Sequence, residues 1–251
     1  MALGIVKFNG ISTADLGLIV QFSPSYKFPE REYETLHIPG RNGDLVVDKG
    51  SFQNVERTYS LAKVFKQGEK FVSSANAIVT WLHSANGYAR LEDSYEPDYY
   101  RMAMYKSDGE MNNYYDEATV LEVTFECKPQ RYLISGEKIV EVPDGQSLTI
   151  KNPTGFDASP VIKFDIANGA SPVITVGDNT MTLTPITDGY PHTIVIDCEN
   201  MECYDPNSNK LYNSNLILNS GSFPVLKGNS DTTISITNAT NLSIQPRWWT
   251  L

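Results

Sequence analysis

The chain has 251 residues, of which 41% are hydrophobic and 20% are charged, and its formal net charge at pH 7 is -10. This acidic balance excludes sequence-independent nucleic-acid binding as a main role, because neutralising phosphates requires clustered lysine and arginine. No apolar run approaches the ~18 residues that a membrane-spanning helix needs, so we expect no membrane insertion. The length accommodates one large domain or two modest ones.

The N-terminal residues and the cysteines indicate the compartment. Residues 1–7 have no charged stretch followed by a long apolar run, so we expect no secretory signal. The three cysteines, Cys127, Cys198 and Cys203, are odd in number and widely spaced, which favours free thiols over a disulfide framework. Cys198 and Cys203 have no second ligand pair nearby, so no metal site is expected. These features predict synthesis in a cytoplasm.

The first strong signal along the chain is a turn sequence, Pro39-Gly40-Arg41-Asn42-Gly43-Asp44. Gly40 and Gly43 adopt positive φ at little cost, and Pro39 restricts the entry to the turn. Strand-like segments, residues 33–38 and 45–47, flank it, and an Asn-Gly pair between two such segments is typical of a β-hairpin. Taken alone, the pattern also fits an ordinary surface hairpin.

The remainder of the first part is predicted to be mostly strands. In residues 120–127 apolar and polar side chains alternate, which predicts one buried face made by Leu121, Val123, Phe125 and Cys127. Further strands are expected at residues 59–65, 88–95 and 99–105, the last two joined as a pair at residues 96–98.

One helix is predicted, over residues 69–85. Phe71, Ala75, Ile78 and Leu82 repeat at helical spacing, and Gly87 closes the segment. Such a stripe is typical of core packing, so we expect the helix to lie on a sheet.

A change in composition predicts a domain boundary near residue 135. The first 135 residues carry 32 charged side chains and 24 Asn, Ser or Thr, whereas the remaining 116 carry 18 and 35. The second part reads as short strands separated by turn residues, which predicts a β-sandwich. One expected hairpin joins residues 138–142 to residues 147–151 through the turn at residues 143–146.

Motifs for catalysis and metal binding are weak. His37, His83 and His192 share no motif, and neither a nucleophile elbow nor a phosphate-binding loop is present. Residues 205–209 begin like a calcium loop, but Lys210 stands where the sharp turn needs glycine, so a polar turn is the better interpretation. Acidic residues at positions 92–98 lie among tyrosines, as in a glycosidase cleft. Acidic residues around a strand connection usually form a solvated edge, so we expect no enzyme here.

Several short segments together resemble one protein family. They are Phe8-Asn9-Gly10, Leu16-Gly17-Leu18-Ile19-Val20, the turn at residues 39–44, Gly50-Ser51-Phe52-Gln53-Asn54, Cys127-Lys128-Pro129-Gln130-Arg131-Tyr132 and Gly221-Ser222-Phe223-Pro224-Val225-Leu226-Lys227-Gly228-Asn229. In this order and spacing they resemble the distal tail (Dit) proteins of siphophages that infect Gram-positive hosts. The resemblance covers nearly the whole chain.

The resemblance implies a mainly β fold with two domains. Residues 1–135 would form a ring-forming, β-sandwich-like domain with one α-helix, and residues 136–251 a galectin-like β-sandwich. Independently of the resemblance, the aromatic residues at 245–251 are expected to dock, either on the first domain or against a neighbouring subunit. The implied function is that of a structural, non-enzymatic hub of the tail tip or baseplate in the virion. Six copies would form a ring through which DNA only passes.

The same resemblance implies partners and places them around the ring. The major tail protein and the tape-measure protein would lie above it, and the tail-associated lysin or fibre below. Receptor-binding or other baseplate proteins would attach to the second domain. No cofactor is implied.

For the ring contact we expect the hairpin residues Gly40, Arg41, Asn42, Gly43 and Asp44, with Arg41 and Asp44 available for ion pairs. Two alternatives remain at this point: a carbohydrate-binding module for cell-wall polysaccharide, and a wall-degrading hydrolase. Galectin-type sugar sites use a His, Arg, Asn and Trp cluster. Here only His192 and Arg247 stand in the second part, with no Trp before Trp248, so that pocket is not recognisable.

Overall fold

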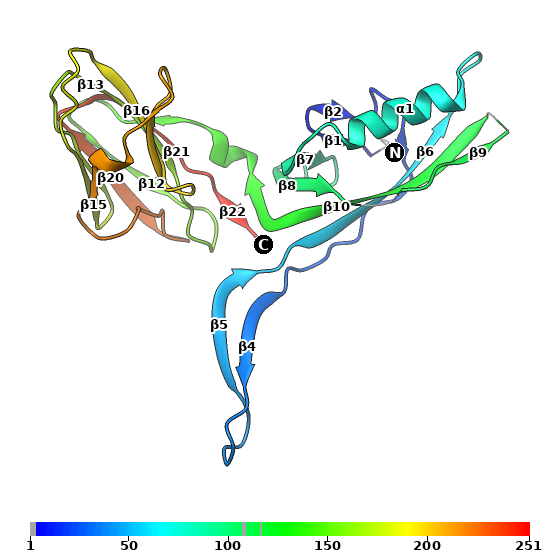
Figure 1. The fold of residues 1–251 in the computed structure, drawn as a ribbon, viewed down its shortest axis with the longest axis horizontal. Helices are drawn as coiled ribbons and strands as arrows, with labels where there is room; N and C mark the ends of the chain where they lie inside the picture. Colours follow the sequence, from blue (N-terminus) through cyan, green and yellow to red (C-terminus); the bar gives the residue numbers. More distant parts are fainter. Residues whose placement is uncertain (1–3, 107–108, 116) are drawn as a thin grey trace. The chain divides into compact units, whose positions relative to one another are not determined.

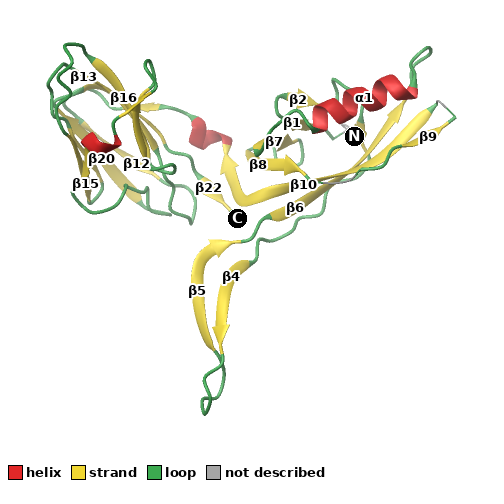
Figure 2. Ribbon diagram, in the orientation of Figure 1, coloured by secondary structure: helices red, strands yellow, loops and turns green. Residues whose placement is uncertain are grey.

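The computed structural model describes residues 4–106, 109–115 and 117–251, so residues 1–3 of the N-terminal segment discussed above lie outside it. Strands account for 48% of the chain and helical residues for 8%, which confirms the mainly β class. The chain divides into two compact units, Met1–Arg131 with Leu251, and Tyr132–Thr250. Figures 1 and 2 show their elements. Every helix in the described residues is too short or too polar to traverse a lipid bilayer.

The first unit is built on one antiparallel sheet with strand order β2-β1-β7-β8-β10-β6-β3. Its strands are β1 (Val6–Phe8), β2 (Ile11–Ser12), β3 (Ile19–Val20), β6 (Val55–Val64), β7 (Ala89–Asp93), β8 (Tyr99–Tyr105) and β10 (Ala118–Leu133). β9 (Asn112–Tyr114) pairs with the start of β10. The predicted pairing of the strands around residues 96–98 is confirmed as β7 against β8.

The core of the first unit follows from the alternation in β10. Leu121, Val123, Phe125 and Cys127 are all buried, as the pattern predicts. The Phe125 ring lies 4.8 Å from the Phe8 ring and 6.4 Å from the Trp81 ring, which joins β10 to β1 and to the helix. An aromatic cluster of this kind buries a large apolar area and determines how the helix sits on the sheet.

The predicted helix forms as α1 (Phe71–Leu82), shorter than residues 69–85 at both ends. Ile78 and Leu82 of the expected stripe are buried, and Trp81 joins them and donates its indole N–H to the Phe8 carbonyl at 3.2 Å. The helix ends at His83 rather than near Gly87, because the His83 N–H makes the last bond, to Val79 O at 3.0 Å.

The predicted hairpin forms a separate two-stranded sheet of β4 (Arg31–Leu36) and β5 (Leu45–Phe52). The connection is residues 37–44, because β4 ends at Leu36, two residues before the expected end of the strand at residue 38. Pro39 cannot donate a backbone hydrogen bond to the ladder, so the strands separate before the Asn-Gly pair is reached. Strand β5 also continues five residues beyond the expected residues 45–47.

The second unit contains two sheets, with strand orders β11-β21-β13-β16-β17-β18 and β12-β20-β14-β15-β19. The first sheet contains β11 (Val140–Glu141), β13 (Val161–Ile166), β16 (His192–Asp197), β17 (Glu202–Asp205), β18 (Lys210–Leu211) and β21 (Thr240–Gln245). The second contains β12 (Ser147–Lys151), β14 (Val173–Val176), β15 (Asn179–Leu183), β19 (Leu216–Leu218) and β20 (Asp231–Thr237). Buried side chains from both sheets, among them Phe164 and Met181, share one core, which is the arrangement of a sandwich.

The hairpin expected around residues 143–146 is wrong. The turn itself exists, with Gln146 N–H donating to Pro143 O at 3.0 Å. However, β11 pairs with β21 and β12 pairs with β20, so the two flanking strands belong to different sheets. The turn is a crossover between the layers of the sandwich, and its chemistry alone does not distinguish the two outcomes.

Two of the C-terminal aromatic residues pack within the second unit. Trp248 is buried, and the Trp249 ring stacks on Phe156 with centroids 4.6 Å apart. The Trp249 indole N–H also donates to Asp157 O at 2.8 Å. The short strand β22 (Trp249–Thr250) begins at this residue, and before it Trp248 O accepts the Leu133 N–H at 2.8 Å, a bond within the second unit. Both indoles therefore have packed surroundings.

Candidate functional site

The candidate functional site is the arm, defined as β4, β5 and their connection (residues 31–52). Its two strands form a sheet that no other described strand joins. Figure 1 shows the arm extending away from the main sheet of the first unit. An isolated two-stranded hairpin is only marginally stable in water. Contact with another molecule would stabilise an arm of this length, so the arm is suited to such a contact.

Both faces of the arm carry exposed apolar side chains. Thr35 lies opposite Val46, and Leu36 lies opposite Leu45, so these two pairs point to opposite faces. Val46 is 56% exposed and Leu36 is 45% exposed. Apolar residues on both faces of an uncovered hairpin are a recognised aggregation hazard unless a partner covers them.

All five residues expected at the ring contact lie at the tip of the arm and are exposed. Gly40 and Gly43 have φ of +83° and +80°, the conformation for which glycine is suited. Asp44 is 3.0 Å from His37, Oδ1 to Nδ1, and therefore has a partner in its own chain. Arg41 makes no side-chain hydrogen bond or ion pair with any described residue, so it is the cation that the tip presents.

The root of the arm is held by a charged pair. Arg31 Nε donates to Asp48 Oδ1 at 3.0 Å, and Arg31 Nη2 also contacts Asp48 Oδ2. This hydrogen bond holds the pKa of Asp48 below its ordinary value. The Arg31 guanidinium lies 5.4 Å from the centre of the Phe52 ring. These contacts hold together the segment of the two strands where the register shifts.

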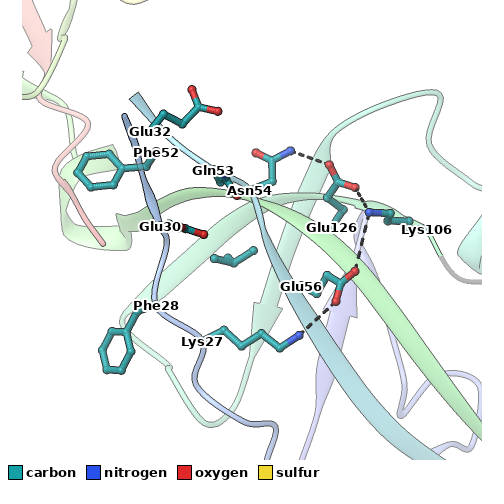
Figure 3. Close-up of a pocket in the computed structure, with 11 residues that line it drawn as sticks. Lys27, Phe28, Glu30, Glu32, Phe52, Gln53, Asn54, Glu56, Lys106 and Glu126 are labelled. Atoms are coloured by element: carbon teal, nitrogen blue, oxygen red, sulfur yellow. Dashed lines mark hydrogen bonds and ion pairs between the residues drawn. The ribbon is translucent and has the colours of Figure 1, made fainter. Parts of the chain in front are cut away.

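Beside the root lies a cavity of about 640 Å³, drawn in Figure 3. It is lined by Lys27, Phe28, Glu30, Glu32, Phe52, Gln53, Asn54, Val55, Glu56, Lys106 and Glu126. On one side Lys27 pairs with Glu56 at 3.1 Å, and Lys106 pairs with Glu126 at 2.8 Å. The hydrogen bond from Lys106 lowers the pKa of Glu126. The cavity is open, polar and rich in carboxylates, and it belongs entirely to the first unit.

Two of the acidic residues at positions 92–98, Asp93 and Glu96, have arginine partners. Asp93 accepts from Arg57 at 2.8 Å and from the Tyr59 hydroxyl at 2.6 Å. Glu96 contacts Arg101 at 2.9 Å and Arg131 at 2.7 Å. A glycosidase needs two carboxyl groups free to flank a sugar, whereas these two are engaged in a network among packed side chains.

Polar residues of the second unit are similarly engaged. His192 lies between Asp205 and Asp188, with N–O distances of 3.0 and 2.9 Å. Arg247 pairs with Asp197 at 2.8 Å. The two residues considered for a galectin-type sugar site therefore both have partners within the unit. Among the described residues, no three His, Cys, Asp or Glu side chains gather closely enough to hold a metal ion.

Sequence reasoning located the tip but missed the apolar arm and the cavity at its root. The run Leu45-Val46-Val47 was recognised as a strand, but an exposed strand cannot be distinguished from a buried one by composition. Phe28, Glu30 and Glu32 alternate with other residues just before and within β4. That alternation was the available signal for side chains that share one face.

Comparison with known proteins shows the fold. No family model and no curated protein matches the sequence. Among solved structures, the Dit protein (gp 19.1) of phage SPP1 matches with a TM-score of 0.73 and 15% identity, over 97% of both chains. A chain of the phage p2 baseplate, in its activated conformation with Sr, matches with a TM-score of 0.52 and 8% identity, again over 97% of both chains. The expected resemblance to distal tail proteins is thus confirmed at the level of fold.

Proposed function

We propose that this protein is a structural hub of a bacteriophage tail tip or baseplate. Six copies close into a ring around the DNA passage and connect the tail tube to the proteins of host adsorption. The chain is synthesised in the host cytoplasm, functions in the virion and catalyses no reaction.

The fold match along almost the entire chain carries this proposal. The SPP1 protein is described as a paradigm of the hub adsorption apparatus in phages that infect Gram-positive bacteria, and the match covers 97% of both chains. The baseplate chain of phage p2 gives the same coverage. Fold alone does not imply function, so the exposed arm supplies the second support.

In the ring, the first part of the chain (residues 1–135) makes the contacts between copies. The arm is an asymmetric projection, and a contact between two different surfaces of identical subunits produces a ring when its rotation closes. Gly40, Arg41, Asn42, Gly43 and Asp44 at the tip belong to this contact. The second part (residues 136–251) is the attachment domain for receptor-binding or other baseplate proteins, with the tube and tape-measure proteins above the ring and the lysin or fibre below.

The test is the mass of the purified full-length protein by light scattering, followed by negative-stain imaging of the peak. We expect a ring with a central hole. Val47→Lys on the arm is expected to lower the measured mass toward that of a monomer, because it places a charge in an apolar contact.

Ile217→Lys provides the matched control. Val47 is 41% exposed and Ile217 48% exposed, but Ile217 lies on β19 of the second unit. The control variant is expected to retain the ring. A native protein that stays monomeric at high concentration, alone and with purified tube protein, would contradict the hub proposal.

The carbohydrate-binding alternative has weaker support. The second unit has a cavity of about 700 Å³ lined by polar residues that include Asp144, Lys163, Asp165 and Asn241. The described residues lining it include no aromatic ring, which is the usual platform for a sugar face. Calorimetric titration with solubilised cell-wall polysaccharide distinguishes the two: the hub proposal predicts no binding heat.

A further inference from the structure

The cavity at the root of the arm carries negative charge that its own chain does not neutralise. Its two lysines, Lys27 and Lys106, are engaged with Glu56 and Glu126. The carboxylate of Glu30 makes no hydrogen bond or ion pair with any described residue, and that of Glu32 accepts only the Ser51 hydroxyl, at 2.6 Å. Two carboxylates therefore remain available for a cation from outside.

An exposed aromatic ring lines the same cavity as these carboxylates. Phe28 is 83% exposed and contacts the Tyr26 ring edge-on at 5.3 Å. In Figure 3, Phe28 and Phe52 lie on the side of the cavity where Glu30 and Glu32 are found, away from the lysine pairs. An aromatic face next to a carboxylate suits a guanidinium group, which stacks on the ring and donates to the oxygens in its plane.

The same chemistry already occurs once within this chain. The Arg31 guanidinium lies over the Phe52 ring at 5.4 Å while it pairs with Asp48. Phe28, Glu30 and Glu32 offer a similar combination without the arginine. An arginine from another molecule would complete it.

The arm of a second copy carries such an arginine. Arg41 is exposed at the tip and has no described side-chain partner. It cannot reach the cavity of its own chain, because β5 alone has eight residues, on the order of 25 Å in extended conformation. Tip and cavity lie at opposite ends of the paired strands, so the contact has to join different copies.

We propose that Arg41 of one copy binds in the root cavity of the next, against the Phe28 ring and between the carboxylates of Glu30 and Glu32. This inference rests on the proposed ring function and assigns its receiving surface. Each copy offers one tip and one cavity, so the contact is head-to-tail and closes only when the rotation per copy closes.

Cross-linking of the full-length protein tests the contact. Arg41→Cys and Glu30→Cys variants are purified separately, mixed, and treated with a short bismaleimide. The native thiols of Cys127, Cys198 and Cys203 are buried, and burial raises their pKa values to about 12, so they do not compete. A covalent dimer is expected in the mixture but not with either variant alone. Lys49→Cys mixed with Glu30→Cys is the matched control, and it should give no dimer.

A charge exchange gives an independent measurement. Arg41→Glu is expected to raise the concentration needed for half-assembly at least tenfold, and Glu30→Arg in the same chain should recover most of this loss. Rings that form normally with Arg41→Glu and give no cross-link would overturn the tip-to-cavity contact while leaving the ring proposal intact. Native protein without rings and without the cross-link would overturn both.

Discussion

Arg31 Nε donates to Asp48 Oδ1 at 3.0 Å across the root of the arm, and the same oxygen accepts the Gly50 N–H at 2.9 Å. The Arg31 contact binds β4 to β5 where the pairing shifts register, and the Gly50 contact lies within β5. A bulge of this kind leaves backbone groups unpaired, and the Asp48 carboxylate compensates for part of this. This carboxylate therefore supports the pairing of β4 with β5 at the root of the arm.

Asp48→Ala is expected to loosen the arm without unfolding the chain. Amide hydrogen exchange in peptides from residues 31–52 should become faster, while the melting temperature stays unchanged. The pKa of Asp48 is lowered in the folded protein. The stabilisation from its ionised carboxylate is therefore fully present above the ordinary pKa of aspartate and is lost as the pH falls through the lowered value. Lys49→Ala, on the same strand, is the control; equal exchange in both variants would contradict a special role for Asp48.

Phe125→Ala should cost the first unit about 3–5 kcal/mol in free energy of unfolding, since it removes a large buried side chain. Phe125 is fully buried among the rings of Phe8, Tyr59, Trp81 and Tyr105. Urea unfolding followed by tryptophan fluorescence gives the value. Phe28→Ala makes the same chemical change at an exposed site and should stay within about 0.5 kcal/mol of the native protein.

His192 makes the second unit sensitive to pH. Its hydrogen bond to Asp205, with a further one to Asp188, raises the pKa of the imidazole. The stability from charged His192 is fully present below the unfolded-state pKa of about 6.5 and is lost as pH rises through the raised value. Asp188 and Asp205 have lowered pKa values, so both stay ionised over this interval.

The measurement is amide exchange in β16 and β17 at pH 6 and at pH 8.5, with exchange rates corrected for their intrinsic pH dependence. Protection should be greater at pH 6, and His192→Gln should remove the difference and cost about 1.5–3 kcal/mol at pH 6, the usual range for hydrogen bonds to charged groups. His83→Gln, at an exposed position on the first unit, controls for a general effect of histidine loss. Unchanged pH dependence in His192→Gln would refute the assignment.

Gly228 is required by a close approach of two backbones. A Cβ at this position would lie 2.5 Å from the Gly155 carbonyl carbon and 2.8 Å from Phe156 N. Gly228→Ala should therefore destabilise the second unit by about 1–3 kcal/mol through overpacking. Gly155→Ala is the matched control, because its Cβ would meet only Asn229 Nδ2, at 3.5 Å. Thermal unfolding of both variants compares them, and equal melting temperatures would contradict the packing argument.

Several features of this protein follow from the sequence alone, because they depend on local periodicity. The alternation in residues 120–127 predicted the buried face of β10, and the helical spacing of Ile78 and Leu82 predicted α1. The Gly40 and Gly43 turn was recognised because positive φ has a strong residue preference. The resemblance to distal tail proteins rested on short segments in a fixed order, and the fold bears it out.

Other features were decided only by the tertiary structure. The turn at residues 143–146 has the chemistry of a hairpin, yet its strands separate into two sheets because each finds its partner more than 80 residues away, in β21 and β20. The free energy contributed by a local turn preference is small compared with the free energy gained by burying apolar side chains between the two sheets. The exposure of Val46 on the arm, and the cavity at its root that Phe28, Glu30 and Glu32 line, likewise depend on which strands lack a neighbouring strand. No local sequence pattern encodes a missing neighbour.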